Sequence, residues 1–178
     1  MIIEHLDGIS NAIASLPLTK FLEILKVLNT AIEQGKTIYL FGNGGSALNA
    51  SHIAGDFIKN TGRHMKVEAL TDSNYLITGY ANDNRYDDIF WLQMEDSLEK
   101  GDVVIALSGS GRSINIVKAV GNARARGAVT VALTGQDGGY IKNMVDICLI
   151  VGSDVMEQIE DIHLIIGHML TTELRCRK

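Results

Sequence analysis

The chain has 178 residues, of which 46% are hydrophobic and 21% charged, and a net charge of -5. This length suffices for one domain with a sizeable core, and the acidic balance without a Lys/Arg block argues against binding DNA or RNA. The two cysteines have no metal-ligand or C-x-x-C spacing, and no apolar run approaches the ~20 residues of a membrane span. We therefore expect a cytoplasmic protein with reduced cysteines that binds neither nucleic acid nor membrane.

The chain begins with a segment of helical periodicity and continues as an alternation of strands and helices. Residues 1–34 carry apolar side chains at helical spacing. Short runs rich in β-branched and aliphatic residues predict five strands, and helical spacing between them predicts three helices. The strands are expected at 37–41, 66–70, 102–107, 129–133 and 146–151, and the helices at 46–60, 85–100 and 112–126. Because buried parallel strands are apolar almost throughout, this alternation predicts a doubly wound parallel sheet.

The last segment, 156–176, has the wide apolar stripe of a long amphipathic helix. Gly101 and Gly127 are interpreted as stops at the C-terminal ends of helices. We expect a single domain over 1–178, with an N-terminal helical part (1–34) and an α/β core with the C-terminal helix (35–178). Since crossover helices already cover both sheet faces, we expect the terminal helices to contact another copy of the chain at least in part.

A glycine-rich turn follows the first predicted strand directly. Its residues are Gly42, Asn43, Gly44 and Gly45, and a helix begins just after them. Ligands of open α/β folds bind at this edge, because main-chain N–H groups and the helix dipole point there and glycine allows close approach. The alternative interpretation is a tight turn with Ser46 as helix N-cap.

A second loop of this kind follows the third strand and contains Ser108, Gly109, Ser110, Arg112 and Ser113. Hydroxyls and amides at a helix N-terminus suit a phosphate dianion, and an Arg adds a charge-assisted contact. The alternative is a capped helix with a flexible lead-in. Neither loop has the spacing of a nucleotide P-loop or of G-x-G-x-x-G, so we expect a ligand with one phosphate and no nucleotide.

Asn82 and Asp83 form a polar segment between two helical stretches. Their short side chains suit hydrogen bonds to sugar hydroxyls. A plain turn with an Asp or Asn cap is the alternative.

Titratable groups are concentrated on two helices. His52 and Asp56 stand four residues apart on one helix face, a spacing that suits a metal ion or an acid/base pair, although a surface ion pair is the alternative. Glu160 and His168 on the last helix are about 80° and ~12 Å apart, which is awkward for one metal reached from one helix. One possibility is that subunit packing brings Glu160 and His168 together from different copies of the chain. The alternative is that these titratable residues form a solvated edge of the helix, with His168 as a core histidine whose hydrogen bonds are satisfied. Further titratable side chains on this helix are Glu157, Asp161 and His163.

Five segments in this order resemble the phosphoheptose isomerase branch of the sugar isomerase (SIS) domains: FGNGGSALNASHIAGDF, ANDNRYDDIF, SGSGRS, ALTGQDGG and QIEDIHLIIGHML. The resemblance covers essentially the whole chain. It implies a flavodoxin-like, three-layer α-β-α sandwich with a five-stranded parallel sheet. It also implies a homotetramer whose active sites are shared between subunits.

The resemblance assigns roles to individual residues. It implies that the substrate is contacted by Asn43, Gly44, Gly45, Asn82 and Asp83. It implies that the phosphate is bound by Ser108, Gly109, Ser110 and Ser113. It further implies one Zn²⁺ per active site, with metal ligands and catalytic groups among His52, Asp56, Glu160 and His168. The best-known members have Glu in place of Asp56, Gln in place of Glu160 and Asn in place of Arg112.

The resemblance implies isomerisation of sedoheptulose 7-phosphate to D-glycero-D-manno-heptose 7-phosphate through an enediol. Asp56 or Glu160 is the candidate base, and His168 is the candidate acid. A non-catalytic SIS tetramer that binds the bacterial replication initiator, or a sugar-phosphate sensor, is the alternative. Retention of all four titratable residues favours the enzyme.

Overall fold

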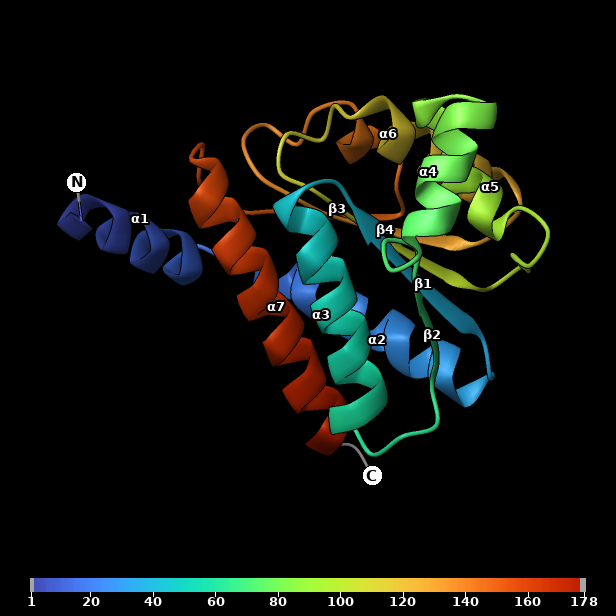
Figure 1. Ribbon diagram of the computed structural model, residues 1–178. Coiled ribbons are helices and arrows are strands. Elements are labelled where there is room, and N and C mark those ends of the chain that lie inside the picture. Colours follow the sequence, from blue (N-terminus) through green and yellow to red (C-terminus); the bar gives the residue numbers. More distant parts are fainter. Residues whose placement is uncertain (1, 177–178) are drawn as a thin grey trace.

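The computed structural model describes residues 2–176 and contains a five-stranded, all-parallel sheet between two layers of helices (Figure 1). The strand order is β2-β1-β3-β4-β5. This confirms the three-layer α-β-α fold, and each strand lies within one residue of its expected limits. The strands are β1 (Thr37–Gly42), β2 (Lys66–Ala69), β3 (Val103–Ser108), β4 (Val129–Thr134) and β5 (Ile147–Ile150).

Three helices, α2, α3 and α7, pack on one face of the sheet, and α5 and α6 pack on the other. In chain order the helices are α1 (Ile2–Ala14), α2 (Leu18–Glu33), α3 (Gly45–Asn60), α4 (Asn74–Asp83), η1 (Tyr86–Asp88), α5 (Trp91–Met94), α6 (Ile114–Ala125), η2 (Ile141–Asn143) and α7 (Met156–Cys176). Gly127 has a φ of 85° directly after the last turn of α6, which confirms it as a helix stop. Within residues 2–176, no helix combines the length and apolar character needed to cross a membrane.

The two sheet faces bury separate halves of the core, because successive side chains of a strand point to opposite faces. Ile38 and Leu40 of β1 face the α2/α3/α7 layer. Tyr39 and Phe41 face the other layer, where the Phe41 ring stacks on Phe90 with centroids 4.9 Å apart. All four β1 side chains are at most 1% exposed, as expected of a central parallel strand.

The single helix expected over 85–100 is wrong. This segment contains only the short η1 and α5, followed by turns that lead into β3. Ile89, Phe90 and Trp91 are buried in succession, and an amphipathic helix with one buried stripe cannot bury three consecutive side chains. Asp102 then accepts a hydrogen bond from the Glu99 amide (2.8 Å) and fixes the turn before β3. Gly101 also has a positive φ, but α5 already ends at Met94, so Gly101 does not stop a helix.

The topology determines where a ligand can bind. β1 is followed in sequence by β2 on one side, while β3 lies on its other side. The connections after β1 and β3 therefore diverge to opposite faces, and a crevice opens at their carboxyl ends, as in other doubly wound sheets. Both polar loops singled out in the sequence begin there.

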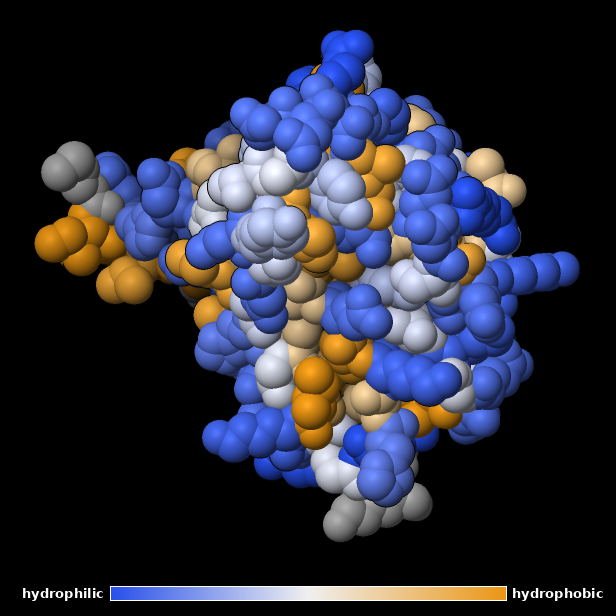
Figure 2. Space-filling view, turned by 45° about the vertical axis from the view of Figure 1, so that its right-hand side comes forward, coloured by the Kyte–Doolittle hydropathy of each residue, from blue (hydrophilic) through white to orange (hydrophobic). Residues whose placement is uncertain are grey.

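Helix α1 projects from the body of the molecule at the N-terminus (Figure 1). The Gln158 side chain of α7 donates to the His5 carbonyl (3.3 Å), and the His5 ring lies 3.7 Å from the Asp161 carboxylate. The outer side chains Ile2 and Ile3 are 79% and 73% exposed, and apolar surface is visible on this projection in Figure 2. Such an exposed apolar helix is typical of a contact with another protein surface.

Candidate active site

A cavity of about 180 Å³ lies at the carboxyl ends of β1 and β3. It is lined mostly by small polar residues, together with two residues from the start of α7. The lining residues are Asn43, Ser46, Leu107, Ser108, Gly109, Ser110, Ser113, Met156 and Glu160. The structure thus brings together the two sequence-predicted loops and Glu160, which is more than 100 residues away from the first loop in the sequence.

The serine loop presents its hydroxyls at the start of α6. Ser113 is the N-cap residue of that helix, but its side chain makes no capping hydrogen bond. The interpretation of this loop as a conventionally capped helix is therefore wrong for the Ser113 hydroxyl, and Ser113 lines the cavity instead. Helix N-termini carry partial positive charge, so this end of the cavity suits an anion.

Asn43 is held by two residues that the sequence analysis missed. Its amide nitrogen donates to Asn115 Oδ1 and its amide oxygen accepts from Asn115 Nδ2, both at 2.9 Å. The Tyr86 hydroxyl also donates to Asn43 Oδ1 (3.1 Å). Asn115 is 2% exposed, and it occupies the apolar stripe of α6 beside Ile116 and Ala119. A polar residue at such a position is the signal by which sequence analysis can find a buried hydrogen-bonding role.

The glycine turn brings α3 close to Glu160. Helix α3 begins at Gly45 after the N-cap Gly44, so Ser46 is not the cap that the alternative interpretation assumed. A Cβ atom at Gly45 would overlap the Glu160 carboxylate. The carboxylate therefore occupies the space that glycine leaves open at the first turn of α3.

A second cluster of side chains, on α3 and α7, joins His52, Asp56 and His168. The two ring Nε2 atoms are 3.2 Å apart, and Asp56 Oδ2 lies 3.5 Å from that of His52 and 3.6 Å from that of His168. The two imidazoles are half exposed, while the Asp56 side chain is 19% exposed. The three residues come from a single chain, and among residues 2–176 this is the one group suited to hold a metal ion.

The close packing of α3 and α7 makes this cluster possible. The two helices run side by side (Figure 1), with the Asn49 side chain donating to the Glu160 carbonyl (2.8 Å) near their starts. Further along, Gly167 faces Ile53, and a Cβ at position 167 would overlap the Ile53 side chain. The absence of a side chain at Gly167 lets the helices approach where His168 meets Asp56.

The spacing of the three donor atoms matches tetrahedral zinc. Zn²⁺ binds imidazole nitrogen and carboxylate oxygen at about 2.1 Å, which places neighbouring donors of a tetrahedron roughly 3.4 Å apart. The observed separations of 3.2 to 3.6 Å agree with this value. Glu160 is not a member of the group and lines the cavity instead.

Helix α7 carries one exposed histidine, His168, and one buried histidine, His163. The alternative that His168 is a satisfied core histidine is wrong, because its side chain is 49% exposed. The buried histidine is His163, at 0% exposure, and neither of its ring nitrogens has a hydrogen-bond partner among residues 2–176. Burial lowers the pKa of His163 to about 4, so the ring is neutral, and the nearby Thr134 backbone only partly opposes this shift.

Asn82 and Asp83 lie in the last turn of α4 rather than in a loop. Both are exposed, and the Asn82 amide donates to the Asp83 carboxylate (2.8 Å). They do not line the cavity, whereas the following Tyr86 reaches Asn43. The ANDNRYDDIF segment therefore contacts the site of this chain through its tyrosine.

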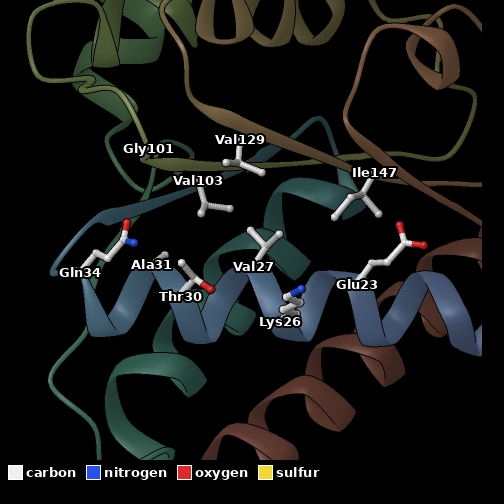
Figure 3. A pocket seen from close by; sticks show the side chains of 10 residues that line it. All are labelled: Glu23, Lys26, Val27, Thr30, Ala31, Gln34, Gly101, Val103, Val129 and Ile147. Atoms are coloured by element: carbon white, nitrogen blue, oxygen red, sulfur yellow. The ribbon is translucent and has the colours of Figure 1, made fainter.

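A larger cavity, of about 350 Å³, lies between α2 and the amino ends of β3, β4 and β5 (Figure 3). Val27, Val103, Val129 and Ile147 form its apolar walls. It is at the sheet edge opposite to the polar loops, and it contains neither a phosphate cradle nor an acid/base group of the clusters above. The candidate active site is therefore the smaller cavity, which contains the serine loop, Asn43 and Glu160.

Comparison with known proteins places the chain in a family. A model of the SIS domain matches residues 7–135. A probable phosphoheptose isomerase from Thermoplasma acidophilum is 35% identical over 171 residues, covering 94% of this chain and 93% of the relative. A phosphoheptose isomerase from Nitratiruptor sp. is 38% identical over 143 residues, covering 79% of this chain and 76% of the relative.

Solved structures agree with this assignment. A phosphoheptose isomerase from Neisseria gonorrhoeae superposes with a TM-score of 0.91 at 28% identity, over 98% of this chain and 95% of that one. One from Francisella tularensis gives 0.90 at 27% identity, over 99% and 95%. The chain therefore belongs to the SIS domain family, in its phosphoheptose isomerase branch.

Proposed function

We propose that the protein is a sugar-phosphate isomerase that converts sedoheptulose 7-phosphate to D-glycero-D-manno-heptose 7-phosphate through an enediol. The observation that carries this proposal is the convergence of the serine loop, Asn43 and Glu160 on one cavity at the β1/β3 crevice. Relatives named phosphoheptose isomerase at 35% and 38% identity support the substrate class.

The serine loop binds the phosphate in this proposal. The hydroxyls of Ser108, Ser110 and Ser113 and the N-terminus of α6 provide donors and a favourable potential for a dianion. Asn43, Gly44 and Gly45 contact the sugar. Asn82 and Asp83 do not line the cavity of this chain, so their proposed contacts with the sugar depend on the shared active sites of the assembly proposed below. Fixing the phosphate lets binding energy remote from the reacting carbons orient them.

The reaction moves protons only and needs no oxidant. The carboxylate of Asp56 or Glu160 removes a proton from the terminal hydroxymethyl carbon beside the ketose carbonyl, and the carbonyl oxygen takes up a proton, which gives the enediol. A proton then returns to the former carbonyl carbon, with His168 as the acid, while the terminal hydroxyl gives up its proton, and the product is the aldose.

One Zn²⁺ per active site is part of this proposal, with His52, Asp56, Glu160 and His168 as ligands. The tetrahedral spacing of three donors supports it. Bound there, the ion would stabilise negative charge on the substrate oxygens.

We further propose a cytoplasmic homotetramer with shared active sites. Glu160 is eight residues before His168 on α7, roughly 12 Å along the helix axis, so a Glu160 from a neighbouring subunit would complete the zinc site. The exposed apolar side of α1 supports assembly, and the two free cysteines support a reducing compartment.

The decisive experiment incubates the purified protein with sedoheptulose 7-phosphate, with and without a chelator, and follows the aldoheptose phosphate. Turnover that a chelator abolishes and Zn²⁺ restores is expected. Binding of the ketose without conversion would instead identify a sensor. To test the shared site, the inactive Glu160→Ala and His168→Ala proteins are mixed so that their subunits exchange. Recovered activity is expected only if each active site contains residues from two subunits.

A further inference from the structure

Arg112 belongs to the phosphate loop, yet it does not line the cavity. Its Nη2 atom lies 2.6 Å from Asp137 Oδ2, and its Nη1 atom donates to the Ser110 carbonyl (2.9 Å). The guanidinium also lies over the Tyr140 ring, 5.9 Å from the centroid. Two of these partners, Asp137 and Tyr140, belong to the segment after β4, and the third, Ser110, belongs to the loop itself.

The segment after β4 offers a fixed anchor for this side chain. Asp137 accepts from the Gly139 amide through its carboxylate (3.0 Å), and its carbonyl accepts from Lys142 Nζ (2.9 Å). The Arg112 and Gly139 contacts hold the pKa of the Asp137 carboxyl at about 2, so the carboxylate is charged at neutral pH. Both partners of the ion pair are therefore charged at neutral pH.

The main chains of the two segments are also joined. The Gly135 amide donates to the Gly109 carbonyl (3.0 Å), and the Ile141 amide donates to the Gly111 carbonyl (3.1 Å). A Cβ at Gly139 would overlap the Ser110 carbonyl, so the backbones approach closely at that point. The Arg112 side chain thus bridges Ser110 and Asp137, beside these backbone contacts.

We propose that Arg112 is a positioning residue, which fixes the Ser110 backbone against Asp137 so that the Ser110 hydroxyl and neighbouring amides face the substrate phosphate. It acts through Ser110 and does not touch the phosphate. This inference rests on the proposed function, since it assumes that the loop binds a phosphate.

The competing explanation, that Arg112 swings into the cavity to bind the phosphate, predicts the opposite effect for one variant. Asp137→Asn removes the anchoring charge. If Arg112 positions the loop, this variant weakens phosphate binding. If Arg112 is itself a phosphate ligand, the variant frees the guanidinium and tightens binding.

The test measures the dissociation constant of inorganic phosphate by calorimetry for wild type, Arg112→Ala, Asp137→Asn and the double variant. Because the pair is largely exposed, each single change is expected to weaken binding by about two- to fivefold. The double variant should be no weaker than the singles, because both remove the same interaction. Lys20→Ala, which breaks an exposed ion pair of 2.8 Å with Glu23 on α2, is the matched control and should bind as wild type does.

Kinetics supply a second readout. The KM for sedoheptulose 7-phosphate should rise by the same factor in both single variants, with kcat within about twofold of wild type, because the reacting end is untouched. Tighter phosphate binding by Asp137→Asn, or unchanged binding in both variants, overturns the inference and leaves the proposed function standing. A wild-type protein that binds no phosphate overturns both.

Discussion

Asn43 and Asn115 exchange two amide hydrogen bonds of 2.9 Å, one in each direction. The pair fixes the orientation of each amide relative to the other, since flipping one of them would place donor against donor and acceptor against acceptor. Asn115 also accepts from the Ile116 amide (3.0 Å), which ties the pair to the backbone of α6. A buried residue that never reaches the cavity therefore sets the side-chain position of a candidate substrate contact.

Asn115→Ala should lower the free energy of unfolding by about 1–3 kcal/mol, because Asn43 and the Ile116 amide lose their partners. It should also raise the KM for the sugar phosphate. Tyr86→Phe removes only the hydrogen bond from a half-exposed ring and should cost less than about 1 kcal/mol. Urea denaturation and initial-rate kinetics check both variants, and equal losses in the two would contradict the importance of the amide pair.

Asp56→Asn should abolish turnover, with a loss of at least about 100-fold, while inorganic phosphate binds as in wild type. The reason is that the substitution removes a carboxylate from the His52/His168 cluster and leaves the serine loop intact. Asp96→Asn, at an exposed position, serves as control. Full activity of Asp56→Asn would refute the assignment of Asp56.

His52→Ala should weaken Zn²⁺ binding by at least about tenfold, because it removes one of three donors that are already at tetrahedral spacing. Titration of the metal-free protein with Co²⁺, followed by visible absorption, reports the coordination directly. His64→Ala changes an exposed histidine outside the cluster and should titrate as wild type does. Identical curves for the two variants would exclude His52 as a ligand.

Gly45→Ala should leave stability nearly unchanged but lower kcat by roughly ten- to a hundredfold. The added Cβ would overlap the Glu160 carboxylate, which is the end of a flexible side chain and so moves at little cost to the fold. Gly55→Ala on the same helix meets no atom within 4 Å and should retain full activity. If both variants turn over normally, the position of Glu160 has no bearing on catalysis.

The stability of the protein should depend on His163 between pH 6.5 and pH 4. The unfolded chain binds a proton at this ring at its ordinary pKa of 6.5, whereas burial lowers the folded pKa to about 4. Protons therefore favour the unfolded state, and the stability present above pH 6.5 falls by about 3 kcal/mol as the pH drops to about 4. Urea denaturation at a series of pH values should show a shallower decline in His163→Leu than in wild type, and parallel curves would rule this contribution out.

The sheet could be predicted from sequence because central parallel strands are buried on both faces and so leave continuous apolar runs, as in β1 and β3. The region 85–100 could not, because its apolar residues recur at helical spacing in the sequence. Only the fold shows that Ile89, Phe90 and Trp91 are all buried in succession. Periodicity describes one buried stripe and does not describe side chains buried on several sides.

The candidate site was only partly accessible to the same reasoning. The spacing of His52 and Asp56 predicted a shared helix face, but the approach of His168 depends on tertiary packing between α3 and α7. The sequence singled out Arg112 as a charge near the phosphate, whereas its partner Asp137 lies 25 residues away on another loop. Local sequence patterns identify residues that can bind a ligand or transfer a proton. Tertiary packing determines which of these residues contact one another.

Gly167 carries no functional group, yet it determines whether two imidazoles and a carboxylate share one point in space. A homologous chain with every donor intact but a bulkier residue at this position should hold its helices apart, so the three donors would no longer lie at the spacing of a metal site. Whether such a sequence can form the metal site must therefore be judged from the residue at position 167 as well as from the donor residues, because the helices can approach only where that residue has no Cβ.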